Sequence, residues 1–526
     1  MLLDARCWSK IPSSAGIKKN HSLFHPVSRD QYPVSRVNYL KLCIFRKLDI
    51  NFKILAYNAL RGENSMNNMK NMIAEFTEHT YGTWNRQKAW KTPILIKDAE
   101  GVYMYDDKGK PYLDFSSQLM CSNLGHKNKA IIEAIIKQAE KLPYIAPAFA
   151  NESAMAAVEA LRSVMPEGLD KFFFSTSGTE ANEAALKMVR QSKAPAYKII
   201  SRYHSYHGAT PAGAAFTGDP RRWFSEQARC TIEGVRFAPD NYCYRCPFAL
   251  KYPECNVQCA RYLDYMIKEE GNVAAMIVEP VVGTNGRIVP PPEYFPILRR
   301  ICDENGVLLI ADEVMSGWFR TGKAFAMEHW DVIPDILTTA KGSTGAYTPV
   351  GITASTQSVS DFFEEELFCH GHTYAYHPLA ASPIPAAVSE YKKLMDSGLP
   401  QKTSKHLQEK LYELAENHEC IGDVRGIGHF WALEIVKNRK TKEPFDVKAD
   451  KLSGKALMTG KIAADSMNNG LYMAAWYDTL VIAPPLIITE EQIDEGIDIL
   501  DQSLVIGDKE AVSTDMPASR SSEYIK

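Results

Sequence analysis

Short apolar segments alternate with amphipathic segments through the middle of the chain, between Lys171 and Thr356. The apolar segments are hydrophobic at nearly consecutive positions, as expected of strands that are buried on both faces of a sheet. The predicted strands are Phe172–Ser175, Lys198–Ser201, Ala274–Val278, Val307–Ala311 and Ile336–Thr339, and the predicted helices are Thr179–Gln191, Ala260–Glu270 and Tyr294–Glu304. This alternation predicts an α/β fold with a mostly parallel sheet covered by helices.

The pattern differs on both sides of this region. Amphipathic helices are predicted at Ala130–Leu142 and Ala154–Met165, and beyond Pro385 long helices mix with the strands Phe430–Val436 and Leu480–Ile482. We therefore expect a second, smaller α/β domain. The predicted divisions are a basic leader (1–65), an N-terminal part of the small domain (66–124), a large domain (125–385), a C-terminal part of the small domain (386–505) and a disordered tail (506–526).

The overall charge is close to neutral, with 60 basic and 63 acidic residues among 526. That balance argues against a dedicated nucleic-acid binder. No apolar run reaches the roughly 18 residues that a membrane-spanning helix needs. We therefore expect a cytoplasmic protein whose partners are small molecules.

The first 65 residues depart from this balance, because they hold eleven basic and only four acidic side chains. Three interpretations are open: a transit peptide, a basic arm for an anionic partner, or a segment that is not translated. We favour the third, because Arg61–Glu63 can be encoded by a purine-rich stretch that resembles a bacterial ribosome-binding site, just before Met66. N-terminal sequencing of the native protein tests this, and residues found before Met66 would refute it.

A turn that favours phosphate follows the first predicted strand. Ser177 and Glu180 fit a capping box at the start of the next helix. The free amides and the dipole of a helix N-terminus favour an anion, and Gly178 lets the backbone approach it closely. Many helices begin with Ser-Gly-Thr and bind nothing, so the turn alone is weak evidence.

Charged residues end two further strands. Asp312 follows the predicted strand Val307–Ala311, and Lys341 comes shortly after the predicted strand Ile336–Thr339. The separation of Asp312 from Lys341 in the sequence equals about one strand–crossover–strand unit. The carboxyl ends of parallel strands share one edge of the sheet, where such folds bind ligands. A partly desolvated lysine can form a Schiff base, and an acid can hold a pyridine nitrogen protonated. Phosphate turn, aspartate and lysine together favour pyridoxal phosphate as a cofactor.

A longer match supports this interpretation. The block Ala311–Gly322, followed by Pro334-Asp335 and Ala340–Gly342, resembles the signature of the class III aminotransferases, and the resemblance extends from about Thr77 to Leu500. It implies fold type I, with a mostly parallel seven-stranded sheet in the large domain. It also implies that Lys341 binds pyridoxal 5'-phosphate covalently and moves a proton, while Asp312 pairs with the pyridine nitrogen.

The same resemblance implies the remaining cofactor contacts. Gly178 and Thr179 would form the phosphate cup, and Val314 would pack on the ring. Tyr206 and His207 lie in a Tyr-His-Gly element whose aromatic ring stacks on the cofactor, although a buried structural pair is the other interpretation. Thr373 resembles a residue that reaches the phosphate of the partner subunit, which implies a homodimer with shared active sites.

The substrate prediction rests on Arg425, which resembles the carboxylate-binding arginine of the family, although a surface arginine is the other interpretation. Several members that take a terminal amine from an α-amino acid carry a glutamate that masks this arginine, at the position where this chain has Thr284. We therefore expect Arg425 to be open in both half-reactions. That favours a donor with an amine at one end and an anion at the other, such as taurine, β-alanine or 4-aminobutyrate, and a 2-oxoacid acceptor such as pyruvate.

Three local stretches resemble the branch of the family that acts on taurine and pyruvate: His79–Trp84, Phe115–Met120 and Thr344–Tyr347. From them we expect Trp84, Leu119 and Met120 to line the substrate pocket. Two alternatives stay open. One is a glutamate-semialdehyde-type aminomutase or a racemase, which needs no oxoacid, and the other is a non-catalytic binding protein that is stapled by a metal.

Four of the eleven cysteines cluster in an insert at 240–260, as Cys243-x2-Cys246-x8-Cys255-x3-Cys259. Paired thiols at such spacings are typical of metal sites, either zinc or an iron–sulfur cluster. Reduced thiols in an ordinary loop are the other interpretation. The sequence leaves the three open, and no metal is assigned.

Overall fold

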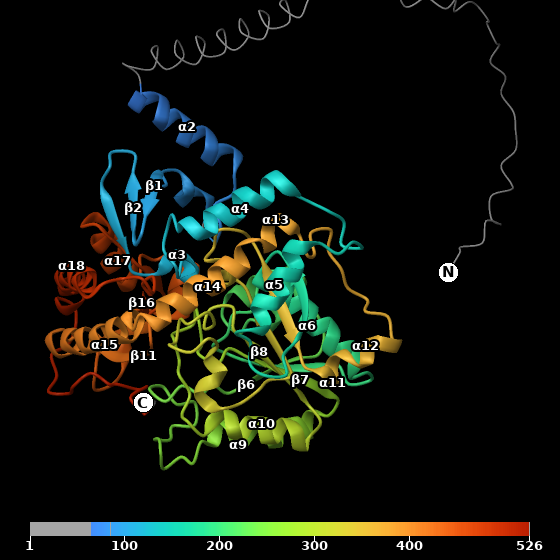
Figure 1. Ribbon diagram of the computed structural model, residues 1–526. Coiled ribbons are helices and arrows are strands. Elements are labelled where there is room, and N and C mark those ends of the chain that lie inside the picture. The colour runs from blue at the N-terminus through green and yellow to red at the C-terminus, as the bar shows by residue number, and fades with distance from the viewer. Residues whose placement is uncertain (1–64, 85, 525–526) are drawn as a thin grey trace, which may run out of the picture. The chain divides into compact units, whose positions relative to one another are not determined.

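The computed structural model describes residues 65–84 and 86–524 (Figure 1). The basic leader up to residue 64 lies outside the described residues, so its three interpretations stay predictions. The chain divides into two compact units, Met1–Pro93 and Ile94–Lys526. In the described part of the first unit, α2 (Ser65–His79) and the 3₁₀ helix η1 (Gln87–Trp90) meet through an edge-to-face contact of Phe76 with Trp90. No helix of the described residues is both long and apolar enough to cross a membrane.

The second unit is built around a seven-stranded sheet, as predicted. In spatial order its strands are β4 (Lys171–Ser175), β10 (Gly351–Ser355), β9 (Ile336–Thr339), β8 (Leu308–Asp312), β7 (Val273–Val278), β5 (Lys198–Arg202) and β6 (Val235–Ala238). Only β10 runs antiparallel to its neighbours, so the sheet is mostly parallel. All five predicted strands are present in it.

The sheet is apolar on both faces because helices cover both. Along β7, Met276 and Val278 pack into a core shared with α9 (Gln258–Glu270) and α10 (Tyr294–Glu304). The alternate residues Ala275 and Ile277 pack with α6 (Gly178–Ser192) on the other side. Each buried Val, Ile or Met side chain of this kind stabilises the fold by about 1.5–3 kcal/mol. This two-sided burial explains why the strands read as continuous apolar runs.

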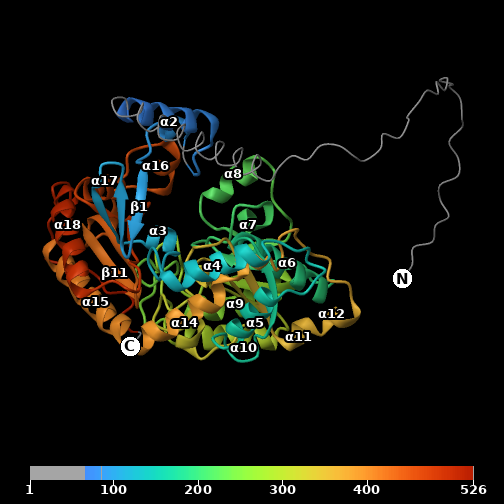
Figure 2. The same cartoon turned by 45° about the horizontal axis from the view of Figure 1, so that its top comes forward.

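Further helices surround this layer. The long α14 (Pro383–Asp396) packs against α4 (Lys129–Lys141) and α5 (Glu152–Arg162), as Figure 2 shows. The shorter helices are α3 (Ser117–Met120), α7 (Pro211–Phe216), α8 (Arg221–Gln227), α11 (Gln357–Ser360), α12 (Phe362–Glu365), α13 (Pro378–Ala381), η2 (Ala326–Trp330) and η3 (Lys341–Thr344).

Two smaller sheets complete the second unit. One contains β1 (Ile96–Glu100), β2 (Tyr103–Asp106), β3 (Pro111–Asp114) and β14 (Leu471–Tyr472), and the other contains β11 (Ile421–Ile427), β12 (Phe430–Asn438), β16 (Thr479–Ile482) and β15 (Ala474–Trp476), with β13 (Glu443–Pro444) on β12. The parallel pairing of β3 with β14 joins segments from the two ends of the chain. The helices of this part are α15 (Leu399–Asn417), α16 (Lys448–Ser453), α17 (Met458–Asn468) and α18 (Glu490–Asp508).

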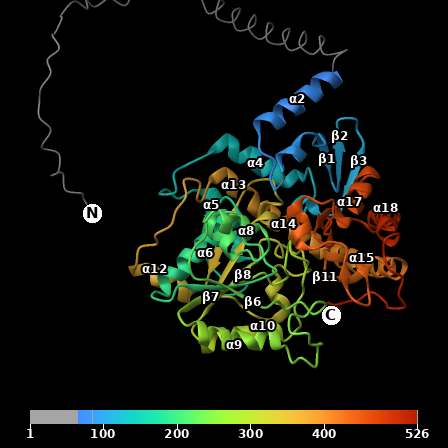
Figure 3. The same ribbon diagram turned by 180° about the vertical axis from the view of Figure 1, so that it is seen from behind.

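The prediction of a disordered tail at 506–526 is wrong for the part that is described. Helix α18 continues to Asp508, and the chain beyond it runs beside β11, close to the C-terminus marked in Figures 1 and 3. Ser519 accepts a backbone hydrogen bond from Val424 at 2.8 Å and donates one to Gly422 at 2.9 Å. The tail binds through backbone groups and through the hydroxyls of Ser521 and Ser522, all of which are polar. These groups cover the otherwise unpaired edge of β11.

A buried histidine ties α18 to the start of β11. His418 is 4% exposed, with Nδ1 2.6 Å from Oδ2 of Asp508 and Nε2 3.1 Å from Oδ1 of Asp501. Burial alone would lower the pKa of His418, but the two carboxylates outweigh it and raise that pKa. The protonated imidazole therefore stabilises the folded state at low pH, and this stabilisation is lost as the pH rises through the raised pKa.

We therefore predict that the melting temperature falls by about 1–3 °C between about pH 6 and pH 8 because of His418. Differential scanning fluorimetry of the wild type and of His418→Gln across this range measures the effect. The variant should be less stable at pH 6 and should show a flatter pH dependence. Parallel curves for the two proteins would contradict the prediction.

Candidate active site

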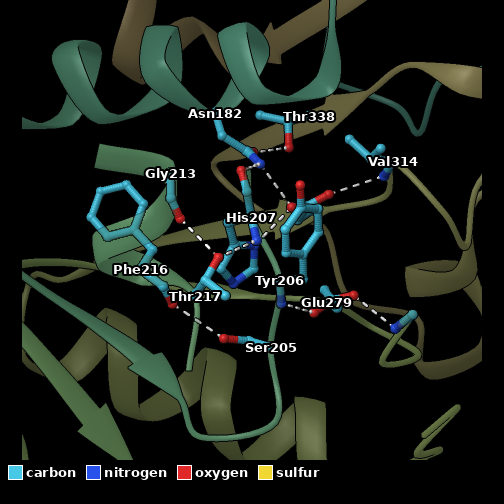
Figure 4. Close-up of polar contacts among 12 residues, drawn as sticks. Asn182, Ser205, Tyr206, His207, Gly213, Phe216, Thr217, Glu279, Val314 and Thr338 are labelled. Carbon is cyan, nitrogen blue, oxygen red and sulfur yellow. Dashed lines mark hydrogen bonds and ion pairs between the residues drawn. The ribbon is translucent and has the colours of Figure 1, made fainter. Parts of the chain in front are cut away.

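Asp312 lies at the carboxyl end of β8 and is only 4% exposed. Its Oδ2 atom lies 2.7 Å from Nδ1 of His207 and accepts a 2.8 Å hydrogen bond from the side-chain amide of Asn182. Its Oδ1 atom accepts one from the backbone N–H of Val314 at 3.1 Å. His207 and Asn182, both labelled in Figure 4, reach this carboxylate from two segments of the chain. The three contacts fix its orientation.

Asn182 is a site residue that the sequence reasoning missed. It is buried on α6, where its amide also donates to the carbonyl of His207 at 2.9 Å and its oxygen accepts from the hydroxyl of Thr338 at 2.6 Å. A buried amide is retained at little cost only when its groups are hydrogen-bonded. The signal for it was a polar residue on the otherwise apolar face of a helix.

The N-terminus of α6 is formed by the predicted turn. The Ser177 hydroxyl accepts from the backbone N–H of Glu180, as a cap should, but the Glu180 carboxylate accepts from the backbone and hydroxyl of Thr176 instead of closing the box on Ser177. A Cβ on Gly178 would lie 2.8 Å from the side chain of Val314. Only glycine therefore lets the first turn of α6 lie this close to the residues after Asp312.

Thr179 follows in the same turn, and its side chain lies close to the backbone of Gly208. Gly208, next to His207, has a φ of +140°, and a Cβ there would lie 2.6 Å from the Thr179 hydroxyl oxygen. The amides of the first helical turn have no acceptor within the helix, so they are available to an anion. The structure thus brings the predicted phosphate turn and the Tyr206-His207 loop together.

Lys341 follows β9, the neighbour of β8, and Asp312 is the register partner of Thr338 in β9. The lysine and the aspartate therefore share the carboxyl edge of the sheet, as their spacing predicts. The backbone of Lys341 has a φ of +39°, a strained value for a residue with a side chain. Burial lowers the pKa of its amine, although nearby Cys121 and Asp312 act against this. With a lowered pKa, a larger fraction of the amine is unprotonated near neutral pH and can act as a nucleophile or accept a proton.

Tyr206 lies in a stack with a cation. The guanidinium carbon of Arg221 lies 3.8 Å from the centre of the Tyr206 ring and 4.3 Å from that of Trp476. Arg221 also forms an ion pair with the buried Asp219. The backbone N–H of Tyr206 donates to Glu279 at 2.8 Å, and burial raises the pKa of the phenol. These contacts fix the loop before His207.

Glu279 is a second residue that the sequence reasoning did not assign. It follows β7 as Asp312 ends β8, and its carboxylate accepts from the backbones of Tyr206 and Gly283. Its position after a buried strand was a signal equivalent to that of Asp312. It holds two loops at the same edge of the sheet.

The predicted pocket residues Leu119 and Met120 lie in a strained segment. Ser117, Gln118 and Met120 all have positive φ angles. Met120 is buried, and Leu119 is 62% exposed. Strained backbone of this kind gathers at functional sites. Trp84 belongs to the first unit and is 58% exposed, so its place in the pocket stays a prediction.

The expectation that Arg425 is open is wrong. It is 1% exposed, and its Nη1 atom lies 2.8 Å from Oδ2 of Asp423 and 2.6 Å from Oε2 of Glu434. Asp423 and Arg425 share one face of β11 because they are two residues apart, and Asp423 pairs in register with Glu434 of β12. Thr284 does not mask the arginine, but these two carboxylates do.

A different buried arginine, Arg287, lies in the segment that follows β7. Arg287 is 1% exposed, donates from Nη1 to the carbonyl of Thr284 at 3.3 Å, and has Nη2 3.9 Å from the sulfur of Met120. Its Nε atom is buried without a hydrogen-bond partner among the described residues. Burial, and after it the charge of Arg425, lowers the pKa of Arg287. In the described part of the chain, no carboxylate forms an ion pair with it.

Thr373 does not join this chain's own site. It is exposed, and its backbone carbonyl accepts from the hydroxyl of Tyr144 at 3.1 Å. Its expected contact lies across a subunit interface and stays a prediction.

The assembled residues fit pyridoxal phosphate. The glycines at 178 and 208 let the first turn of α6 lie close to the residues after Asp312 and to the loop after His207, and the amides of such a turn favour a phosphate. Asp312 presents an oriented carboxylate for a pyridine nitrogen, and Lys341 presents a desolvated amine at the same edge. Helix N-terminus, carboxylate and lysine are the three groups that this cofactor requires.

Comparison with known proteins gives the same result. Residues 85–504 match the family described as aminotransferase class III. The chain is 36% identical to a putrescine–pyruvate aminotransferase of Pseudomonas aeruginosa over 418 residues, 77% of this chain and 88% of the relative. It is 33% identical to a leucine/methionine racemase of Thermococcus litoralis, over 78% of this chain and 90% of the relative.

The fold is also similar to that of a solved transaminase structure. A taurine:2-oxoglutarate aminotransferase from Bifidobacterium kashiwanohense, in complex with pyridoxal phosphate and glutamate, superposes with a TM-score of 0.77 at 34% identity, covering 84% of this chain and 99% of that one. The enzyme therefore has the fold type I of the pyridoxal-phosphate-dependent transaminases. The chain belongs to the class III aminotransferases.

Proposed function

We propose that the enzyme moves the amino group of a taurine-like or ω-amino acid donor to a 2-oxoacid such as pyruvate. The observation that carries this proposal is Arg287, a buried guanidinium next to Met120 with no carboxylate paired to it in the described residues. A buried charge is costly unless an opposite charge meets it. A carboxylate or sulfonate at the far end of a substrate would supply that charge.

Two other arginines of this region, Arg221 and Arg425, are already paired. Arg221 has Asp219, and Arg425 has Asp423 and Glu434. Arg287 is therefore the cation of the three that gains most from an anionic ligand. We propose that it takes the role that the sequence assigned to Arg425.

The catalytic roles follow from the described contacts. The bound cofactor supplies an electron sink for the carbon that loses its proton. We propose that Lys341 accepts this proton and returns it, because its amine is desolvated at the carboxyl edge of the sheet. Asp312, oriented by Asn182 and His207, holds the negative charge that the pyridine nitrogen needs. The first-turn amides at Gly178 and Thr179 bind the phosphate.

We also propose a homodimer in which Thr373 reaches the cofactor phosphate of the second subunit. Its exposure on the isolated chain supports this, as does that of Tyr374, which is 56% exposed. If light scattering shows a monomer under conditions in which the enzyme is fully active, the proposal is refuted.

Replacing Arg287 with methionine is the test of the donor class. Each charged hydrogen bond that the variant loses costs about 1.5–3 kcal/mol, so we expect the apparent dissociation constant for taurine or β-alanine to rise roughly 10- to 100-fold. The constant for putrescine, which has no anionic end, should change little. Bleaching of the cofactor's visible band by donor alone measures both, without any contribution from the oxoacid.

Arg162→Met, at the exposed end of α5, is the matched control and should behave as the wild type. Equal weakening for taurine and putrescine would contradict the role of Arg287. Failure of every taurine-like or ω-amino acid donor with the wild type would instead refute the proposed function. Product formation without any oxoacid would favour the aminomutase or racemase alternative.

A further inference from the structure

Two consecutive residues of the segment 284–289, which follows β7, have left-handed backbone conformations. Gly286 has a φ of +117°, and Arg287 has a φ of +50°, which is a strained value for a residue with a side chain. Strained backbone of this kind persists only where the surrounding structure holds it in place. The contacts of this segment therefore determine where the guanidinium of Arg287 lies.

Arg425 holds the first part of the segment. Its Nε atom donates to the backbone carbonyl of Gly286, and a Cβ on Gly286 would lie only 3.0 Å from its Nη2 atom. The position of Arg425 is set in turn by Asp423 and Glu434, at 2.8 Å and 2.6 Å from its Nη1 atom. The arginine that these carboxylates mask thus fixes the backbone next to Arg287.

The C-terminal tail contacts the same segment at its other end. The hydroxyl of Tyr524 donates to the backbone carbonyl of Val289 at 2.6 Å, two residues after Arg287. Burial raises the pKa of this phenol well above its usual range, so it keeps its proton and remains a donor. The strained backbone is therefore held on both sides of Arg287.

The tail also supports Asp423. The backbone N–H of Ser521 donates to Oδ1 of Asp423 at 3.0 Å, and the Ser521 hydroxyl donates to Oδ2 at 2.6 Å. Because Asp423 orients Arg425, and Arg425 holds the carbonyl of Gly286, a change at Ser521 is transmitted to the segment. The tail thus acts on it by two routes, directly at Val289 and indirectly through Asp423.

The tail ends against the cysteine-rich insert between β6 and α9. The ring of Tyr524 lies 5.1 Å from that of Tyr252, and its hydroxyl lies 3.8 Å from the sulfur of Cys243. Among the residues that the structure describes, no three His, Cys, Asp or Glu side chains are placed to hold a metal ion. An aromatic ring and a thiol of the insert are therefore what the end of the tail meets. One small cavity of the insert is lined by all four clustered cysteines, Cys243, Cys246, Cys255 and Cys259.

We propose that the C-terminal tail is a positioning element for substrate binding, in which Tyr524 and Ser521 hold the segment 284–289 so that Arg287 meets the anionic end of the donor. This inference rests on the role proposed above for Arg287. The match to the aminotransferase family ends at residue 504, so these contacts come from outside the matched part of the chain. The tail acts on donor affinity and not on proton transfer, because its contacts lie on the segment that carries Arg287.

The Tyr524→Phe variant of the full chain, loaded with pyridoxal phosphate, tests this. It loses one hydrogen bond to the segment, so we expect the apparent dissociation constant for taurine to rise roughly 2- to 10-fold. The constant for putrescine and the rate at saturating taurine should not change. Bleaching of the visible band by donor alone measures all three. Ser521→Ala should act in the same direction, and Tyr265→Phe, at an exposed tyrosine of α9, is the matched control.

Two further measurements separate positioning from general stabilisation. In the Arg287→Met background, Tyr524→Phe should weaken taurine binding no further, because the effects of residues that act through one another are not additive. Hydrogen–deuterium exchange followed by mass spectrometry should be faster at residues 284–289 in Tyr524→Phe than in the wild type, and unchanged in Tyr265→Phe.

An unchanged taurine constant in either tail variant would overturn the inference. Equal weakening for taurine and putrescine, full additivity with Arg287→Met, or unchanged exchange at residues 284–289 would overturn it as well. A donor-selective effect of Arg287→Met with none of Tyr524→Phe refutes the role of the tail alone. An Arg287→Met variant that shows no selectivity refutes the proposed role of Arg287, and this inference with it.

Discussion

The Lys341→Ala enzyme is expected to lose amino-group transfer and the visible absorption band of the bound cofactor. Lys341 provides the amine at the carboxyl edge of β9, and burial lowers its pKa toward the range in which it can exchange protons. A methyl group can neither bind the cofactor covalently nor move a proton. Loss of the proton transfer alone lowers turnover by about 100- to 10,000-fold.

Absorption spectra and steady-state turnover with an excess of donor and oxoacid measure this effect. Lys171→Ala is the matched control, because Lys171 is an exposed lysine at the start of β4, paired only with Glu364 on the surface. It should retain both the band and the rate. Turnover that persists in Lys341→Ala, with correct folding shown by circular dichroism, would mean that Lys341 is not the catalytic lysine.

Replacing Asp312 with asparagine should have the second largest effect. The substitution removes the negative charge that we propose pairs with the pyridine nitrogen, and preorganised charges of this kind contribute on the order of 100- to 1,000-fold to the rate. It also places an amide where three donors already converge, from Asn182, His207 and Val314. One donor then faces another, which costs about 1–3 kcal/mol of stability.

Turnover and cofactor affinity should be measured separately for Asp312→Asn. We expect kcat to fall by the stated factor, while saturating cofactor still restores full occupancy through the phosphate turn. His207→Gln serves as the comparison, because it keeps the charge and removes only one contact. A kcat for Asp312→Asn within a factor of three of the wild type would show that the charge is not required.

Much of the fold could be predicted, because the hydropathy of a strand's own residues indicates whether the strand is buried. Val273–Val278 is apolar at every position, and a strand of this kind needs a helix layer on each face, which α6 and the α9–α10 pair provide. Lys341 and Asp312 could be placed together for the same reason. Each ends a buried strand, and parallel neighbours end at one edge.

The two wrong predictions, an open Arg425 and a disordered tail, concern residues whose partners lie far away in the sequence. Whether Arg425 is open depends on Glu434, which meets Asp423 only through the register of β11 with β12. The tail is ordered because β11 is an edge strand whose free backbone groups bind Ser519. Hydropathy carries no information about either, since backbone hydrogen bonds and ion pairs form between polar groups.

The class of fold and the cofactor could be inferred from the amino-acid sequence, and Lys341 and Asp312 could be placed at one edge of the sheet, because these features depend on residue type and on order along a strand. Which arginine is left without a carboxylate, and which cysteines share a cavity, became visible in the folded chain alone. Chain packing sets the pairing of Arg425, leaves Arg287 without a carboxylate partner among the described residues, and brings Cys243 and Cys259 to one cavity. Electrostatic and ligand-binding properties depend on distance in space, and distance in sequence does not specify it.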